Sequence, residues 1–255
     1  MSRRTIDLNC DLGERDDALG VDVDLELLDI VSSANIACGG HAGDEESMRR
    51  TVAAAIPSGV ALGAHPSYPD RANFGRVACD LAGRPLEDVI TSQVEALLRI
   101  VQCSGGELTH VKPHGALYHA AMRRVEIAEA VARAIARLGV PLLLVGQAGA
   151  PALEIWRDMG FDVAAEAFAD RRYEADGLLR ERGKADALID DPVEAAAQAV
   201  RIASGAGVLT ATGAVTSLRA ETICLHSDRP SAIANARTVR DALARAGVRV
   251  QALRQ

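Results

Sequence analysis

The sequence predicts an α/β fold in which parallel strands alternate with helices and close, or nearly close, into a seven-stranded β/α barrel. Short apolar or alternating runs are separated by helix-like patterns seven times along the 255 residues. No composition break, linker or internal repeat divides the chain, which favours a single domain over residues 1–255. Ionisable residues also gather near the carboxyl ends of the predicted strands, where barrel enzymes build their sites. An open doubly wound sheet is the alternative.

The predicted elements follow one another in strict order. The strands are expected at 5–12, 33–38, 60–66, 109–115, 141–146, 162–170 and 221–226. The helices are expected at 22–32, 44–57, 86–104, 124–138, 148–159, 191–204 and 230–246. Asp44 and Asp191 are typical N-cap residues, and Pro192 suits the first helical position. The segment 208–226 is a candidate hairpin leading into the last strand.

Composition excludes several classes of function. The net charge of −7, without a basic patch, argues against nucleic-acid and anionic-membrane partners. No apolar signal segment or membrane-length run is visible, so a cytoplasmic location is expected. The five cysteines are scattered without a CxxC pair, which predicts reduced and mostly buried thiols.

Alternation along the strands separates apolar from polar side chains. In the first strand, Asp7, Asn9 and Asp11 share a face opposite Ile6 and Leu8. The other predicted strands repeat this pattern, and their polar-face residues are His65, His110, Lys112, His114, Glu166, Asp170, Cys224, His226 and Asp228. Burying so many ionisable groups together is unfavourable without a purpose. The pattern therefore predicts a polar pocket in the barrel mouth.

Two local features refine this pocket. The glycine-rich stretch ACGGHAGD (37–44) places His41 at the beginning of a helix, where backbone N–H groups favour anions. Pro113 biases Lys112 toward an extended backbone, and a buried lysine there is expected to pair with a carboxylate such as Asp11. The sequence contains no GxxxxGK[ST], GxGxxG, HExxH or GxSxG motif.

The same segments resemble the LamB/YcsF family. The resemblance rests on IDLNCDLGE (6–14), SANIACGGHAGD (33–44), LGAHPSYPD (62–70), FGR (74–76), HVKPHGALY (110–118), EAFADRRYEADGLLRER (166–182) and TICLHSD (222–228). These stretches are long, occur in order and span nearly the whole chain. The family usually has an aromatic residue at Gly40, arginine at Val77, asparagine at His119 and glycine at Ser227. Gly40 is therefore expected to loosen one pocket wall, and Arg76 to bind a carboxylate without a second arginine beside it.

The resemblance implies a distorted barrel similar to the glycoside hydrolase/deacetylase superfamily. It also implies an activity, that of the A subunit of an ATP-dependent 5-oxoprolinase working with subunits B and C. That enzyme cleaves 5-oxo-L-proline to L-glutamate while ATP, accompanied by Mg, is hydrolysed to ADP and phosphate. No protein-bound metal is predicted from the resemblance.

Opening an activated lactam needs a base for water, an acid for the ring nitrogen, and cations for carboxylate and phosphate. The candidate catalytic residues are Asp7, Asp11, His41, His65, Lys112, His114 and Glu166. The candidate substrate-binding residues are Asn9, Asn35, Arg76, His110, Asp170, Arg171 and His226.

Two alternatives stay open. A metal-dependent, deacetylase-like hydrolase could use Asp11, His41 and His65 as metal ligands, although the helical HxxxH pair that would favour it is missing. A non-catalytic subunit could instead bind the lactam and deliver it to its partners.

Overall fold

The computed structural model describes residues 4–15 and 17–253, and its centre is a closed barrel of seven parallel strands. They are β1 (Thr5–Leu12), β2 (Ser33–Ala37), β3 (Ala61–His65), β4 (Leu108–Val111), β5 (Leu143–Gln147), β6 (Val163–Phe168) and β9 (Thr222–Leu225). Each strand pairs with the next, and β9 pairs with both β6 and β1. The ring is therefore closed, as predicted. The short β10 (Arg249–Val250) extends the pairing at the beginning of β1.

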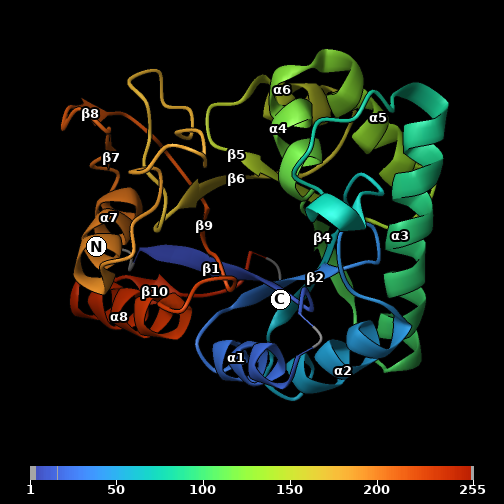
Figure 1. Cartoon of the computed structure of the whole chain (residues 1–255), viewed down its shortest axis with the longest axis horizontal. Helices are drawn as coiled ribbons and strands as arrows, with labels where there is room; N and C mark the ends of the chain where they lie inside the picture. The colour runs from blue at the N-terminus through green and yellow to red at the C-terminus, as the bar shows by residue number, and fades with distance from the viewer. Residues whose placement is uncertain (1–3, 16, 254–255) are drawn as a thin grey trace.

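Helices surround this barrel (Figure 1). They are α1 (Ala18–Leu28), α2 (Glu45–Ala55), α3 (Gly83–Cys103), α4 (Gly115–Arg123), α5 (Val125–Ala136), α6 (Pro151–Asp158), α7 (Pro192–Ser204) and α8 (Ala232–Arg245), with the 3-10 turn η1 (Arg71–Asn73). The two predicted caps are confirmed. Asp44 accepts from the backbone of Ser47 in a capping box, and Asp191 accepts from the backbone of Val193.

The prediction of a strand over 109–115 is wrong at its carboxyl end. β4 stops at Val111, and His114 is the N-cap residue of α4, a helix that the sequence pattern did not indicate. Pro113 lacks an N–H, and Gly115 has a φ of 55°, which favours glycine. The chain still follows β3, because the N–H of Lys112 donates to the carbonyl of Ala64 at 2.9 Å.

Two other elements can be compared with their predictions. Helix α1 begins four residues before the predicted position 22, because Asp17 accepts from the backbone of Gly20 and caps it there. The candidate hairpin is confirmed as the antiparallel pair β7 (Val208–Leu209) and β8 (Val215–Thr216).

The polar and apolar faces of the strands lie as their alternation predicts. On β1, Ile6, Leu8 and Cys10 are buried in the apolar core, whereas Asn9 bonds to side chains from other strands inside the barrel. Gly63 on β3 is required for this interior, because a Cβ there would lie 2.1 Å from Nε2 of His110. The barrel interior is thus a close-packed polar network.

The cysteines and the helices also bear on the predictions made from composition. All five cysteines are free, with Cys10, Cys38 and Cys224 buried and Cys103 exposed. Within the described ranges, no helix has the length and apolar character needed to cross a membrane.

Candidate functional site

A pocket of about 310 Å³ lies at the carboxyl ends of the barrel strands. Its floor comes from β1, β3 and β6 and from the residues that follow β4 and β9, and one wall comes from α4. The loop over 169–191 between β6 and α7 contributes the opposite wall. The charged and aromatic lining residues are Asp11, Glu14, His65, Arg76, Lys112, His114, Tyr118, His119, Arg123, Phe168, Arg171, Arg180, Glu181, Arg182 and His226.

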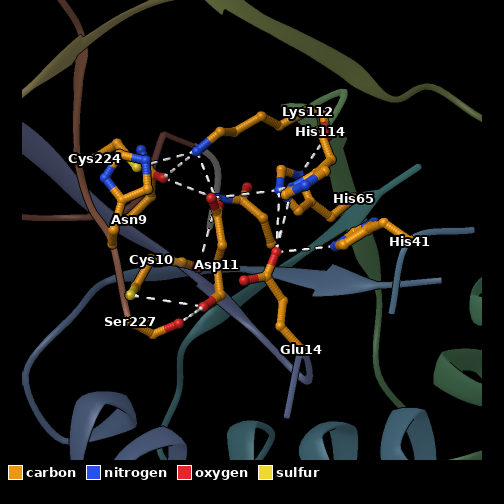
Figure 2. Close-up of polar contacts among 12 residues, drawn as sticks. Asn9, Cys10, Asp11, Glu14, His41, His65, Lys112, His114, Cys224 and Ser227 are labelled. Carbon is orange, nitrogen blue, oxygen red and sulfur yellow. Dashed lines mark hydrogen bonds and ion pairs between the residues drawn. The ribbon is translucent and has the colours of Figure 1, made fainter. Parts of the chain in front are cut away.

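Lys112 is at the centre of the pocket floor. Its Nζ lies 2.9 Å from Oδ1 of Asp11 and 3.1 Å from Sγ of Cys224 (Figure 2). The same Nζ lies 2.9 Å from Oε1 of Glu166. Burial lowers the pKa of Lys112, but the carboxylates, with Asp11 first, raise it well above its ordinary value. Burial likewise raises the pKa of Asp11, and His65 and Lys112 together lower it to well below its ordinary value. The structure therefore holds an ammonium between two carboxylates, as the sequence predicted for Asp11.

Three predicted site residues lie beneath this floor. Asn35 donates to Oδ1 of Asp11 at 2.8 Å and to Oδ1 of Asn9 at 2.8 Å. His110 contacts Asn35 through Nε2 at 2.9 Å. Asn9, Asn35 and His110 are absent from the lining of this pocket, so within the described residues they position Lys112 and Asp11 from below.

Asp7 lies deeper still. Its carboxylate accepts hydrogen bonds from the hydroxyls of Ser32, Ser33 and Thr222, at 2.5–2.7 Å. Burial raises its pKa, and these hydroxyls oppose the rise. Asp7 therefore links β1 to β2 and β9 near the far end of the barrel, away from the pocket.

A second cluster joins one carboxylate to three histidines beside the floor. Ligand atoms of Glu14, His41, His65 and His114 all lie within 4.8 Å of one another. Oε1 of Glu14 is 2.9 Å from Nε2 of His41 and 3.3 Å from Nδ1 of His114. Burial lowers the pKa of His41 to about 4, and burial also lowers that of His114. Burial raises the pKa of Glu14, but its contacts with His114 and His41 lower it far more.

Sequence reasoning missed Glu14. Counting alternate residues stops at the end of β1, and Glu14 follows two residues later, after Gly13 with a φ of 72°. The one available signal was its place at the end of the matched segment 6–14. The structure groups Glu14 and His114 with His41 and His65. Asp11, which the metal-dependent alternative named as a ligand, binds Lys112 through Oδ1, and its Oδ2 lies 3.3 Å from Nε2 of His65.

Arginine side chains surround the pocket entrance. Arg76 and Arg182 both bind the carboxylate of Asp228, at 2.7 and 2.6 Å. Arg171 is only 4% exposed, and its Nε is buried without a hydrogen-bond partner among the described residues. Burial lowers the pKa of Arg171. Arg171 lines the pocket, and a buried guanidinium there is suited to bind an anion.

His226 also lines the pocket. Its Nδ1 is 3.0 Å from both carboxylate oxygens of Asp170, and its ring stacks on Phe168 with centroids 5.8 Å apart. Asp170 does not line the pocket and holds His226 in place from behind. A carboxylate that fixes one imidazole nitrogen leaves the other free for proton transfer.

The departures from the family pattern have specific surroundings. Gly40 is buried against Gln93 and Ser67 and is absent from the pocket lining, so the expected loosening of the wall is not seen. Ser227 donates its hydroxyl to the carbonyl of Asp11 at 2.6 Å. It therefore anchors the end of β1 where a glycine could not.

Comparisons with known proteins agree along the whole chain. The model of the LamB/YcsF family matches residues 6–255. A protein of Chloroflexus aurantiacus named as the A subunit of 5-oxoprolinase is 49% identical over 248 residues, covering 97% of this chain and 98% of that protein. Its namesake from Bordetella pertussis is 44% identical over 247 residues, with 97% and 98% covered.

Solved structures extend the comparison. The crystal structure of the lactam utilization protein from Thermus thermophilus has a TM-score of 0.91 and 40% identity, covering 98% of this chain and 100% of that one. A family 4 carbohydrate esterase from Streptomyces lividans has a TM-score of 0.52 at 12% identity, with 97% and 91% covered. The second similarity concerns the fold alone and agrees with the predicted barrel class.

Proposed function

Because the chain belongs to the LamB/YcsF family, we propose that it is the A subunit of a 5-oxoprolinase. In this proposal it works with subunits B and C, and ATP with Mg is the co-substrate of the complex. The substrate is 5-oxo-L-proline and the product is L-glutamate. Relatives that carry this name and match almost the whole chain support the assignment.

One structural observation carries the chemistry. The buried pair of Lys112 and Asp11 lines the same pocket as the buried guanidinium of Arg171. A small substrate with a carboxylate and an amide presents an anion for Arg171 and a reacting group for the pocket floor. A pocket of about 310 Å³ is of a size suited to a small ligand.

The reaction can be written in balanced steps. The γ-phosphoryl group of ATP moves to the lactam oxygen and ADP leaves. Water then adds to the activated carbon, the ring C–N bond breaks as the nitrogen gains a proton, and a second water releases phosphate. Asp11 takes the proton of the attacking water, and His226 supplies the proton to the ring nitrogen.

The geometry favours His226 over the other candidate acids. Glu166 is fully buried beneath Lys112, and the side chain of His41 has no exposed surface. His226 lines the pocket and is oriented by Asp170. Lys112 and the entrance arginines offset the negative charge that develops on the phosphorylated lactam.

The sequence has no standard phosphate-binding loop, so we expect that the partner subunits are needed for the ATP-dependent reaction. The test is glutamate release from 5-oxo-L-proline by the purified chain, alone and with subunits B and C. Activity is expected only in the complex with ATP. Robust ATP-dependent release by the single chain would contradict the three-subunit assignment.

Asp11→Asn and Arg172→Met form a matched pair of variants. Arg172 pairs with Glu194 outside the pocket, so its loss is expected to leave turnover nearly unchanged. Asp11→Asn is expected to abolish turnover. Full turnover by a folded Asp11→Asn complex would favour a protein that only binds and delivers the lactam.

A further inference from the structure

Hydrogen bonds to backbone carbonyls fix the tautomers of two histidines in the cluster. Nδ1 of His65 lies 2.7 Å from the carbonyl oxygen of Lys112, and Nε2 of His114 lies 3.0 Å from that of Phe74. A carbonyl oxygen only accepts, so each of these nitrogens carries a hydrogen. In the neutral rings, Nε2 of His65 and Nδ1 of His114 therefore carry lone pairs.

These two lone pairs face each other. The two nitrogens are 3.0 Å apart, and Oε1 of Glu14 lies 3.3 Å from the one on His114 and 3.9 Å from the one on His65. All three side chains are almost completely buried. Oδ2 of Asp11 lies a further 3.3 Å from the lone pair of His65, so four acceptor atoms converge here without a hydrogen between them. Such an arrangement is unfavourable unless a cation lies among them.

We propose that Glu14, His65 and His114, with His41 as a fourth and weaker ligand, bind a divalent transition-metal ion such as Zn²⁺. Imidazole nitrogens with one carboxylate suit this class of ion. Bonds of about 2.0–2.2 Å to a tetrahedral metal separate its ligand atoms by about 3.4 Å. The distances of 2.9, 3.0, 3.3 and 3.9 Å bracket that value.

The surroundings match those of metal-binding histidines, which commonly donate their second N–H to a carbonyl or carboxylate. His65 and His114 both do so. His41 does not, because its Nδ1 is buried without a partner among the described residues. His41 stacks on His114, with ring centroids 3.6 Å apart, and contacts Glu14 from the side away from the pocket. It is therefore the ligand whose loss matters least.

The position of the site gives the ion access to ligands. Glu14, His65 and His114 line the pocket that also contains Lys112 and Arg171. An ion held by these three residues presents its remaining face to that pocket. It would be able to bind an oxygen of a small molecule there, so the proposal extends the pocket's chemistry without depending on the substrate named above.

The experiment measures metal binding directly. The untagged full-length chain is stripped with a chelator and titrated with Co²⁺ and Zn²⁺, and metal content, cobalt absorption and the thermal midpoint are recorded. One ion per chain is expected, with a visible cobalt spectrum and a higher midpoint. Absence of stoichiometric metal and an unchanged thermal midpoint would overturn the proposal. The short contact between His65 and His114 would then be explained by a proton that the two rings share.

Variants locate the ion. Glu14→Gln, His65→Asn and His114→Asn are expected to weaken binding by about a hundredfold or more, and His41→Asn by less. The matched control is His119→Asn, since His119 lines the same pocket outside the cluster. If a histidine variant fails to fold, metal binding by Glu14→Gln and the cobalt spectrum of the wild type decide whether the ion binds at this site. Loss of the ion in His119→Asn, or its retention in Glu14→Gln, would contradict this site.

Discussion

Lys112 and Glu166 form an ion pair inside the barrel, with Nζ and Oε1 2.9 Å apart and neither side chain more than 3% exposed. Asp11 contacts the same ammonium from the pocket side. The lysine thus neutralises a structural carboxylate below it and a pocket carboxylate beside it. Stability is therefore expected to depend on the contact of Lys112 with Glu166, and activity on its contact with Asp11.

Lys112→Met is expected to lower the free energy of unfolding by about 3–5 kcal/mol, because it removes the cationic partner of the buried Glu166 and Asp11 side chains. Turnover of the reconstituted complex should fall about a hundredfold or more through loss of a charge contact in the transition state. Lys112→Arg should restore little, since a planar guanidinium does not replace a compact ammonium. Chemical denaturation and glutamate release measure the two effects.

The double variant Lys112→Met/Glu166→Gln separates those effects. Removing both charges should recover much of the lost stability without recovering turnover. Full activity in Lys112→Met alone would show that the lysine is only structural.

Arg171→Met tests the anion site. The guanidinium of Arg171 lines the pocket and is expected to bind the substrate carboxylate, so its loss should raise KM by about thirtyfold or more with a smaller effect on kcat. Arg172→Met is the control, because Arg172 pairs with Glu194 away from the pocket. Equal changes in KM for the two variants would place the carboxylate elsewhere.

Asp170→Asn is expected to change how stability depends on pH. Burial raises the pKa of Asp170, but attraction to His226 and the hydrogen bonds from it lower it below its ordinary value. Asp170 therefore stabilises the fold above about pH 4, and this contribution is lost as pH falls through the lower folded-state pKa. Near pH 7 the variant should lose about 1.5–3 kcal/mol for the charged hydrogen bond removed.

The stabilities of wild type and Asp170→Asn should therefore begin to approach each other below about pH 4 and converge below the lower folded-state pKa of Asp170. Asp22→Asn, on the exposed face of α1, is the control and should stay within about 0.5 kcal/mol of wild type throughout. A wild-type advantage that persists unchanged into acid would refute the assignment.

Gly63→Ala tests the packing of the barrel interior. Its Cβ would lie 2.1–2.5 Å from ring atoms of His110, which Asn35 and Thr109 hold in place. Overpacking should lower stability by about 1–3 kcal/mol or more. Gly183→Ala, with no atom within 4 Å of the added Cβ, should have little effect on a thermal melt. Adding His110→Ala should relieve part of the loss if the ring causes the clash.

Local patterns in the sequence were sufficient for much of this architecture. The alternation in β1 placed Asn9 and Asp11 on the inner face, and the carboxylates of Asp44 and Asp191 located the beginnings of two helices. These features depend on residues within a few positions of one another. Strand periodicity and capping are set at that range, so they can be recognised before the chain is folded.

Barrel closure decided the contacts between residues that are far apart in the sequence. Asn9 meets Thr222 across 213 residues only because β1 pairs with β9, and the same closure brings Lys112 to Glu166. Glu14 lies beyond the alternating strand, so no periodicity revealed it. His114 was predicted from strand alternation, although it caps a helix where a strand was expected. The sequence by itself determined which residues face inward. Only the tertiary structure decided that Glu14, His65 and His114 point their acceptor atoms at one another, because strand register and backbone hydrogen bonds set those directions.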